Sequence, residues 1–334
     1  MRVLVTGGAG FIGANLCRAL AAADDVDKIV ALDDLSSGRA ENLAGIEAVE
    51  LVEGSILDDP LLDKFVADVD AVVHLAARPS VPRSIADPVA SHVANADGTV
   101  SVLEAIRRRP AQDRPHLIVA SSSSVYGANP GLPKREDMVP QPMSPYAASK
   151  LAAEAYSLSY ARSFGMQVLV FRFFNVFGPF QPADHAYAAV VPAFISAALR
   201  GEPLTVHGDG TQTRDFTYVR SIVAVLADAL RRGVTHDGPV NLAFGSRVSV
   251  LELIRTLEEV LGQSLEVCHT APRAGDVPHS QADQSLLRTL ASEVDPVPLE
   301  QGLRETVAWA RSGGQLPAQR PDHPDRGARP AVPY

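Results

Sequence analysis

The chain has 334 residues, of which 46% are hydrophobic and 21% are charged, so it is long enough to bury one large core or two modest ones. Its formal net charge of −9 argues against a general binder of nucleic acid or anionic membranes, because both need a basic surface. The two cysteines, Cys17 and Cys268, lie far apart with no Cys/His cluster around them, which argues against a disulfide framework and against a metal site. We expect a globular protein of the reducing cytoplasm.

The N-terminal sequence MRVLVTGG leads straight into an apolar run, with no apolar stretch of signal-peptide length and no cleavage site. No later segment approaches the ~18 uncharged apolar residues of a membrane span. We therefore expect neither a secretory signal nor a membrane anchor.

Short apolar runs and helical patterns alternate through the first half of the chain. Runs of strand length, rich in Val, Ile and Leu, occupy residues 3–5, 28–33, 48–53, 71–76, 116–120 and 168–174. Apolar residues at helical spacing occupy 11–22, 91–109 and 146–164. Strands that are apolar on both faces and alternate with helices are typical of βαβ units. The pattern predicts an α/β fold with a doubly wound parallel sheet, a Rossmann domain, over residues 1–174.

Beyond residue 175 the elements become shorter and Pro and Gly more frequent. Helices are predicted at 186–200, 221–232, 250–261 and 299–311, between short runs such as PLTVHG and PVNLAF. We expect a smaller mixed α/β region over 175–312, with some segments returning to the Rossmann sheet. Residues 313–334 form a Pro/Gly-rich tail with almost nothing apolar to bury.

The motif TGGAGFIG follows the first predicted strand and opens the first predicted helix. Such a loop lets the backbone turn tightly and approach a pyrophosphate at a helix N-terminus. Asp33 ends the second predicted strand, where a carboxylate can accept from an adenosine ribose hydroxyl, and Asp34 would repel a 2′-phosphate. The loop therefore predicts NAD in preference to NADP. The glycines with the dinucleotide-binding spacing are Gly8, Gly10 and Gly13.

The motif SPYAASK places Tyr146 and Lys150 four residues apart, on one face of a helix. An ammonium one turn away, together with a nicotinamide cation, would lower the tyrosine pKa from its ordinary value of about 10. A phenolate of this kind is a base usable at neutral pH. The alternative for this pair is a merely solvent-exposed helix face.

The motif SSSSVYG follows the apolar run HLIVA. Four serines are typical either of a linker or of hydroxyls placed at the carboxyl end of a strand, where open α/β sheets bind ligands. The position between HLIVA and VYG favours the second interpretation.

Together with Asn95 in NADGT, these motifs resemble an extended short-chain dehydrogenase/reductase. Within that group, SSSSVYG, FFNVFG, GDGTQTRDFTYV and RAGDV resemble the nucleotide-sugar 4-epimerases of the UDP-galactose and UDP-N-acetylglucosamine 4-epimerase kind, from Arg2 to about Arg311. The resemblance implies NAD-dependent 4-epimerisation of a UDP-sugar (UDP-GlcNAc/UDP-GalNAc or UDP-Glc/UDP-Gal) through a transient 4-keto intermediate. It also implies that residues 175–312 mainly bind the substrate.

The resemblance implies a catalytic role for three side chains. Ser122 lies four residues before the tyrosine of VYG and would bridge the sugar O4 and the phenol of Tyr146, while Lys150 would hold the nicotinamide ribose. Related dehydratases carry acids where this chain has Ser123 and Ser124, so epimerisation is favoured. A dehydratase or reductase, and a non-catalytic dinucleotide sensor, are the alternatives.

The resemblance also implies the NAD contacts. Ser55 stands where the family usually has an Asp beside the adenine, and Phe173 replaces a frequent Tyr beside the nicotinamide. The predicted cofactor-binding residues are Gly7, Gly8, Gly10, Phe11, Ile12, Gly13, Asp33, Asp34, Ser55, Ile56, Leu75, Ala76, Ala77, Asn95, Tyr146, Lys150 and Phe173.

For the substrate, the resemblance implies that Arg214 and Arg273 bind the diphosphate, that Asp276 accepts from the nucleotide ribose, and that Asn175 contacts the diphosphate or sugar. Ser280 matches the position that closes the pocket around the C2 substituent, and its small size predicts room for an N-acetyl group. The predicted substrate-binding residues are Ser84, Ser122, Ser123, Ser124, Asn175, Ala189, Val190, His207, Arg214, Arg273, Asp276 and Ser280.

Uronic-acid 4-epimerases share the serine run but tend to have Thr at the place of Asn175 and an Arg soon after, whereas residues 179–182 here are PFQP. UDP-glucuronate is therefore the second candidate substrate. Family members commonly dimerise through helices equivalent to 91–109 and 146–164, so we expect a homodimer that binds neither nucleic acid nor membrane.

Overall fold

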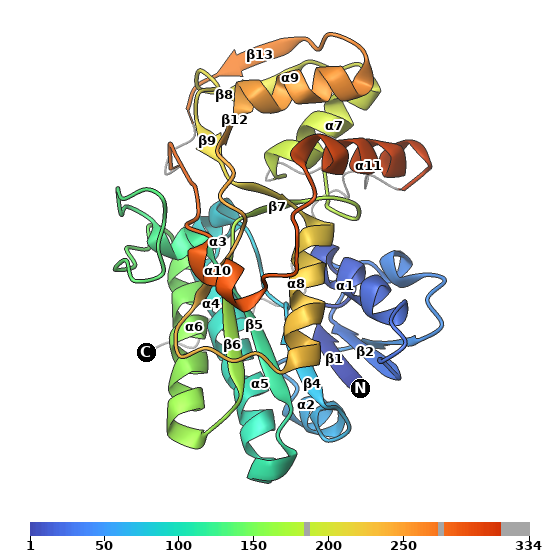
Figure 1. The fold of residues 1–334 in the computed structure, drawn as a ribbon, viewed down its shortest axis with the longest axis vertical. Helices are drawn as coiled ribbons and strands as arrows, with labels where there is room; N and C mark the ends of the chain where they lie inside the picture. The colour runs from blue at the N-terminus through green and yellow to red at the C-terminus, as the bar shows by residue number, and fades with distance from the viewer. Residues whose placement is uncertain (184–187, 273–276, 315–334) are drawn as a thin grey trace, which may run out of the picture.

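The computed structural model describes residues 1–183, 188–272 and 277–314. Its centre is a seven-stranded sheet in the order β3-β2-β1-β4-β5-β6-β11 (Figure 1), and every neighbouring pair is parallel. This is the Rossmann order extended by one strand, which confirms the predicted fold class. The strands are β1 (Arg2–Thr6), β2 (Lys28–Asp33), β3 (Val49–Glu53), β4 (Ala71–His74), β5 (His116–Ser122), β6 (Val168–Phe173) and β11 (Val240–Leu242).

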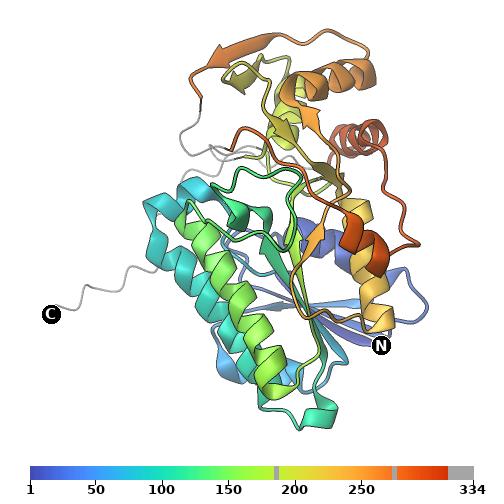
Figure 2. The ribbon, with the colours of Figure 1, turned by 60° about the vertical axis from the view of Figure 1, so that its left-hand side comes forward.

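Helices cover both faces of this sheet (Figures 1 and 2). Alternate strand residues point to opposite faces: Leu4 and Val72 pack against α2, α5 and α6, while Val3 and Val5 share a core with α1 and α8. Because both faces are buried, the strands read as continuous apolar runs. The helices of the sheet are α1 (Phe11–Ala21), α2 (Asp59–Val66), α5 (Gly98–Arg107), α6 (Pro145–Phe164) and α8 (Val219–Arg232).

The smaller region lies beyond one end of the sheet and is built from short paired strands and helices (Figure 1). Its pairs are β7 with β10 and β8 with β13, both parallel, and β9 with β12, which is antiparallel. Its elements are β7 (Asn175–Phe177), α7 (Val190–Arg200), β8 (Leu204–His207), β9 (Thr213–Arg214), β10 (Phe216–Tyr218), β12 (Val248–Ser249), α9 (Val250–Leu261), β13 (Val267–Thr270) and α11 (Leu299–Arg311). The short helix α10 (Ser285–Leu290) instead lies beside β11 of the main sheet (Figure 1).

The structure refines three predicted elements. The helix expected at 91–109 is one continuous helical stretch made of α4 (Pro88–His92), a π-helix η2 (Val93–Asp97) and α5; the Asn95 side chain in its π-helical part makes long-range hydrogen bonds. The run PVNLAF supplies β11, a segment that returns to the main sheet and pairs with β6 at its edge. The helix expected at 186–200 begins at Val190; residues 188–189 are not helical, and 184–187 lie outside the described residues. The remaining helical segments are α3 (Val81–Ala86), η1 (Ala40–Leu43), η3 (Ala111–Asp113) and η4 (Ser123–Tyr126).

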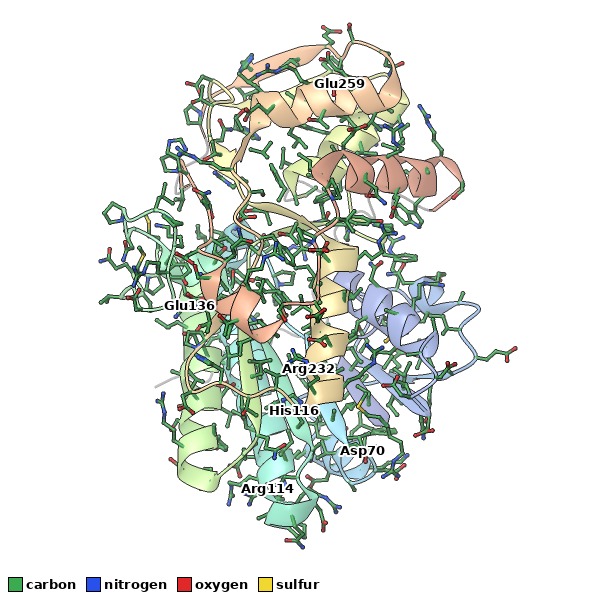
Figure 3. All side chains as sticks on the ribbon, viewed as in Figure 1. Asp70, Arg114, His116, Glu136, Arg232 and Glu259 are labelled. Atoms are coloured by element: carbon green, nitrogen blue, oxygen red, sulfur yellow. The ribbon has the colours of Figure 1, made fainter. Side chains whose placement is uncertain are left out.

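The polarity of the sheet decides where a ligand can bind. Figure 3 labels Asp70, Arg114 and His116 at the lower end of the molecule, where β4 and β5 begin. The carboxyl ends of the strands therefore point up, toward the smaller region. Open α/β sheets bind their ligands at this edge.

Within the three described ranges, no helix is both long enough and apolar enough to cross a bilayer. The same residues contain no group of three or more His, Cys, Asp or Glu side chains that could hold a metal ion. Cys17 is a buried free thiol whose pKa is raised to about 12 by burial, and Cys268 is an exposed free thiol.

Candidate active site

The glycine loop joins β1 to α1 and fits a pyrophosphate. Gly7 has φ 72°, and a Cβ there would lie 2.7 Å from the Ala76 nitrogen; a Cβ on Gly13 would lie 2.1 Å from the Gly7 oxygen. At Gly10 a Cβ would meet only the Gly7 oxygen, at 3.2 Å, so the outer side of the loop is open. No side chain caps α1 at Gly10. The amide groups of its first turn can therefore receive an anion.

Asp33 lies beside this loop at the end of β2. Its Oδ2 accepts from the Ala9 nitrogen at 3.0 Å and its Oδ1 from the Leu35 nitrogen at 2.9 Å. Burial raises the pKa of Asp33, and the backbone donors act in the opposite direction. A Cβ at Gly38 would lie 2.7 Å from the carboxylate, so that glycine leaves it room. The exposed Asp34 instead accepts from the nitrogen and hydroxyl of Ser36.

The other residues predicted to contact NAD surround the same edge of the sheet. The Ser55 hydroxyl accepts from the Leu57 nitrogen at 3.1 Å, and Ile56 packs so closely that a Cβ on Gly98 would lie 2.4 Å from it. Phe173 ends β6 in register with Ser122. Half-buried Phe11 and Ile12 open α1, and Leu75, Ala76 and Ala77 follow directly after β4.

Ser122, Tyr146 and Lys150 come together at the carboxyl end of β5. Ser144 caps α6 by accepting from the Ala147 nitrogen, and Pro145 occupies its first turn, a combination that favours helix initiation. Tyr146 therefore sits in the first turn of α6 and Lys150 one turn later. The Ser122 hydroxyl lies close enough to the Tyr146 phenol to lower its pKa as a hydrogen-bonding partner.

Burial shifts the pKa values of both Tyr146 and Lys150. It lowers the pKa of Lys150, which is 5% exposed, to about 8. It raises the pKa of Tyr146, and the hydrogen bond from Ser122 opposes this rise. Without a bound cofactor, the pKa of Tyr146 is therefore raised, whereas the sequence analysis predicted that it would be lowered. The reason is that desolvation of the phenolate outweighs the hydrogen bond. The expected lowering would have to come from the positive charge of the nicotinamide.

Ser124 determines which way the Ser122 hydroxyl points. The Ser122 Oγ accepts from the Ser124 nitrogen at 3.2 Å and from the Ser124 hydroxyl at 2.9 Å. A hydroxyl has two lone pairs and one hydrogen, so the Ser122 hydrogen is left to be donated to Tyr146. A donor at this position stabilises the phenolate. Ser121 and Ser122 belong to β5 and Ser123 opens η4, so the serine run is part of the ordered strand end.

His74 is a buried residue near this site that the sequence analysis did not select. Its Nδ1 lies 2.7 Å from the Thr6 hydroxyl and its Nε2 lies 3.0 Å from the Thr99 hydroxyl. Thr99 donates to the Asn95 carbonyl, so it accepts from His74, which assigns the proton to Nε2. Burial, with a smaller effect from the charge of Lys150, lowers the pKa of His74 to about 3. The sequence signal that could have identified His74 is a single histidine inside the apolar run AVVHLA.

The polar atoms of Asn95 are occupied by protein contacts. Its Oδ1 accepts from the Arg78 nitrogen at 2.7 Å, and its Nδ2 donates to the Ser149 hydroxyl at 2.9 Å and to the Arg78 carbonyl at 3.3 Å. The Ser149 hydroxyl in turn donates to the Tyr146 carbonyl at 2.8 Å. Asn95 thereby ties the π-helix to the first turn of α6, and its direct contact with NAD stays a prediction.

The predicted substrate residues are more widely spread. Asn175 opens β7, and Ala189 and Val190 mark the start of α7. His207 ends β8, with its Nδ1 2.8 Å from the Thr270 hydroxyl. Ser84 is fully buried and donates to the Val81 carbonyl, so its contact with substrate stays a prediction without support from the geometry.

Arg214 and Ser280 lie on adjoining segments of the smaller region. Nη1 of Arg214 donates to the carbonyls of Thr213, at 2.9 Å, and Pro278, at 3.2 Å. The Ser280 nitrogen donates to the Thr213 carbonyl at 3.0 Å. The two remaining predicted residues, Arg273 and Asp276, lie outside the described residues.

Asp215 is a second residue that the sequence analysis did not select. It is fully buried, and it accepts from the Ser246 hydroxyl at 2.9 Å and from the Ala282 nitrogen at 3.0 Å. Burial raises the pKa of Asp215, and these hydrogen bonds lower it. The carboxylate joins the segment carrying Arg214 to the segment that follows Ser280.

Comparisons with known proteins identify the family of this chain. Residues 3–243 match the model of the NAD dependent epimerase/dehydratase family. The chain belongs to this family. It is 38% identical to the UDP-glucose 4-epimerase of Mycolicibacterium smegmatis, over 94% of this chain and all of that protein. Membership confirms NAD as the cofactor predicted from the glycine loop and Asp33.

Two solved structures of the family share the whole fold. One is a UDP-N-acetylglucosamine 4-epimerase from Methanobrevibacter ruminantium in complex with UDP-N-acetylmuramic acid, with TM-score 0.87 and 38% identity over 93% of this chain and 98% of that one. The other is a UDP-glucuronic acid 4-epimerase from Bacillus cereus in complex with UDP-glucuronic acid and NAD, with TM-score 0.83 and 31% identity over 93% and 99% of the two chains.

Proposed function

We propose that this protein inverts C4 of a UDP-sugar and that it accepts UDP-N-acetylglucosamine along with, or in preference to, UDP-glucose. The observation that carries the reaction type is the meeting of Ser122, Tyr146 and Lys150 at the carboxyl end of β5, beside the glycine loop. The next two side chains are Ser123 and Ser124. Neither is an acid that could assist the loss of water, which favours epimerisation over dehydration.

Each of the three side chains has a distinct task in this reaction. NAD, held by the glycine loop and Asp33, would supply the acceptor for the C4 hydride and the donor for its return. Tyr146 accepts the proton of the 4-hydroxyl and gives it back. When the sugar binds, its 4-hydroxyl would take the place of the Ser124 hydroxyl on the Ser122 Oγ, so that Ser122 bridges the sugar O4 and the phenol oxygen. Lys150, with its pKa at about 8, carries a positive charge at neutral pH and binds the nicotinamide ribose.

The choice of sugar rests on Ser280 and on the chain before α7. Ser280 is small and half-buried beside Arg214, which leaves room for an N-acetyl group. The relative from Methanobrevibacter ruminantium, named as acting on UDP-N-acetylglucosamine, supports the same choice.

UDP-glucuronate is the second candidate, favoured by the similarity to the Bacillus cereus enzyme. A C6 carboxylate needs a cationic partner, and residues 179–182 contain none. Phe180 packs its ring 5.0 Å from the Arg18 guanidinium and 5.4 Å from the Trp309 ring. This part of the chain is therefore committed to contacts with α1 and α11.

The test is to incubate the purified protein with UDP-N-acetylglucosamine, UDP-glucose and UDP-glucuronate and to follow C4 inversion by NMR. We expect NAD to co-purify, inversion of the first two sugars without added cofactor, and little turnover of the third. Net formation of a deoxy sugar, or inversion of UDP-glucuronate alone, would contradict the proposal.

We also infer a cytoplasmic homodimer formed through the η2–α5 segment and α6. Tyr156 on α6 is 48% exposed and Phe164 is 41% exposed, and a second copy of the chain would cover them. Light scattering of the purified protein measures the mass in solution. A mass of one chain would contradict this inference.

A further inference from the structure

A buried ion pair lies directly behind the proposed catalytic residues. Arg172 is the one charged residue of β6, and its side chain is 3% exposed; the side chain of its partner, Glu154 on α6, is 5% exposed. The guanidinium binds the carboxylate through two hydrogen bonds, Nη2 to Oε1 at 2.6 Å and Nε to Oε2 at 3.0 Å. This two-bond geometry fixes orientation as well as distance.

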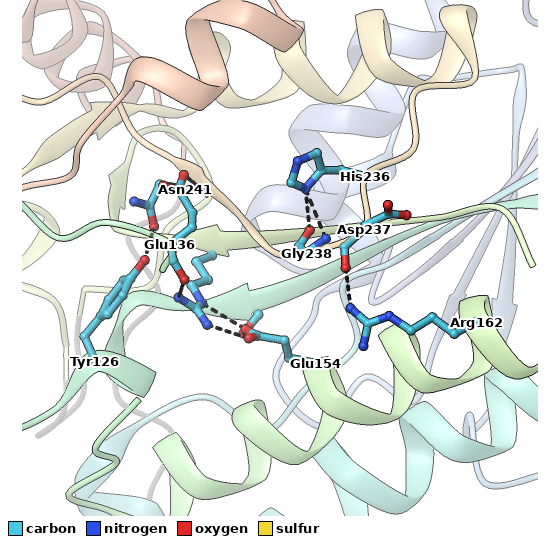
Figure 4. A network of polar contacts seen from close by, with 10 residues as sticks. Tyr126, Glu136, Glu154, Arg162, His236, Asp237, Gly238 and Asn241 are labelled. Atoms are coloured by element: carbon cyan, nitrogen blue, oxygen red, sulfur yellow. Dashed lines mark hydrogen bonds and ion pairs between the residues drawn. The ribbon is translucent and has the colours of Figure 1, made fainter. Parts of the chain in front are cut away.

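The pair is the centre of a wider set of contacts (Figure 4). The Ser121 hydroxyl donates to Oε2 of Glu154 at 2.9 Å. The Arg172 guanidinium lies 4.7 Å from the centre of the Tyr126 ring, and the Tyr126 hydroxyl donates to the Asn241 side chain at 2.7 Å. The contacts therefore join β5, β6, α6, η4 and β11 at one point.

Three members of this set, Ser121, Arg172 and Glu154, are close to residues of the proposed site. Ser121 precedes Ser122, and Arg172 faces Ser121 in the register of β5 and β6. Glu154 follows Lys150 by four residues, so the two lie on one face of α6. A shift of the pair would move the strand end and the helix relative to each other.

Stability alone does not account for such a pair. Removing two charges from water costs about as much as their attraction returns, and apolar residues of similar volume are often as stable in the same place. The pair fixes the orientation of α6 relative to β5, which apolar packing alone would constrain less tightly. A catalytic group displaced by about 1 Å can lose about 100-fold in rate.

We propose that the Arg172–Glu154 pair is a positioning device that holds α6 against the end of β5, so that Tyr146 stays in hydrogen-bonding reach of Ser122. Both residues act through their neighbours and touch neither cofactor nor sugar. The proposal rests on the proposed function for the roles of Ser122 and Tyr146.

The test removes both charges together in the double variant Arg172→Met with Glu154→Gln, in which the glutamine can still accept from Ser121. The matched control is Arg232→Met with Asp228→Asn. That pair also joins a guanidinium to a carboxylate, through Nε at 3.0 and 3.1 Å and Nη2 at 2.5 Å, but it lies at the exposed end of α8, where Figure 3 labels Arg232. All proteins are prepared with their bound NAD.

We expect the double variant to unfold at nearly the wild-type temperature and to retain NAD and its KM, while kcat falls by about 10- to 100-fold. The apparent pKa of Tyr146 should rise by about one unit as the hydrogen bond from Ser122 loosens. It is read from tyrosinate absorbance near 295 nm, as the difference from a Tyr146→Phe protein. The control pair should leave all of these quantities unchanged.

The outcomes separate this proposal from the proposed function. If no UDP-sugar is turned over by the wild type, the proposed function fails, and the Tyr146 titration still decides the positioning role without substrate. An unchanged Tyr146 pKa, or an unchanged kcat, in the folded double variant overturns the proposal. If the double variant does not fold, Arg172→Lys and Ser121→Ala give the same readouts with smaller changes. We expect about 3- to 10-fold losses of kcat from each, and wild-type values in both overturn the proposal.

Discussion

The central sheet and the smaller region hold their functional side chains in different ways. Around the sheet, Asp33, His74 and Lys150 are nearly inaccessible, and hydrogen bonds or packing fix each of them. In the smaller region, His207, Arg214 and Ser280 lie on short strands and loops and remain partly exposed. Ser122 and Tyr146, the groups proposed to handle the proton, are half-buried between these fixed residues. Rigid surroundings keep such groups in position, whereas groups that distinguish one sugar from another can change without disturbing the sheet.

Replacing Tyr146 by Phe removes the proposed general base at the end of the central sheet and should have the largest effect on turnover. We expect kcat to fall by about 10² to 10⁴, the span for losing a general base, with nearly unchanged affinity for UDP. Ser122→Ala should reduce kcat less, because Tyr146 still reaches the proton. Steady-state kinetics measure kcat, and a titration with UDP measures the affinity. Wild-type turnover in the Phe variant would mean that this helix face is only structural.

The protonation of His74 tests how completely the side chains around the central sheet are removed from water. The folded pKa of about 3 lies below the unfolded value near 6.5, so the unfolded chain binds more protons between these pH values. The stability contributed by neutral His74 is complete above pH 6.5 and is lost as the pH falls toward 3. Between pH 7.5 and 4.5 this group should remove about 3 kcal/mol from the free energy of unfolding.

The measurement is urea unfolding of the wild type and of His74→Gln at both pH values. The wild type should lose about 3 kcal/mol more than the variant between pH 7.5 and 4.5. Equal losses in the two proteins would show that His74 is protonated in the folded state.

Ser280→Tyr tests the smaller region and should have the smallest effect. An aromatic ring beside the C2 position should lower kcat/KM for UDP-N-acetylglucosamine relative to UDP-glucose by about 10- to 200-fold. The value for UDP-glucose itself should change little, which serves as the internal control. An unchanged ratio would place Ser280 outside the pocket.

Local sequence signals predicted much of the fold. The predicted strand at 28–33 has the same bounds as β2. The predicted helix at 250–261 has the same bounds as α9, because Ser249 caps that helix and Gly262 ends it in a left-handed conformation. The motifs likewise selected Asp33, Ser122, Tyr146 and Lys150, which the structure brings to one edge of the sheet.

Features that depend on distant partners could not be predicted in the same way. The π-helix at 93–97 is held by contacts from Asn95 to Arg78 and Ser149, which no local pattern contains. The pairing of β11 with β6 joins segments about 70 residues apart. The Arg172–Glu154 pair did leave a signal, an arginine inside the apolar run VLVFRFF, since a buried charge requires a partner.

The place of β11 and α8 has a consequence for synthesis of the chain. When the ribosome has completed residues 1–174, β6 is still an open edge of the sheet. At that stage α1 alone covers the sheet face that α1 and α8 cover together in the complete protein. Uncovered edges and faces of this kind invite pairing with other chains. The nascent chain must reach residue 242 before β6 is paired and α8 covers this face, so a fragment ending at the predicted boundary should aggregate, while one extended through β11 carries every strand of the sheet.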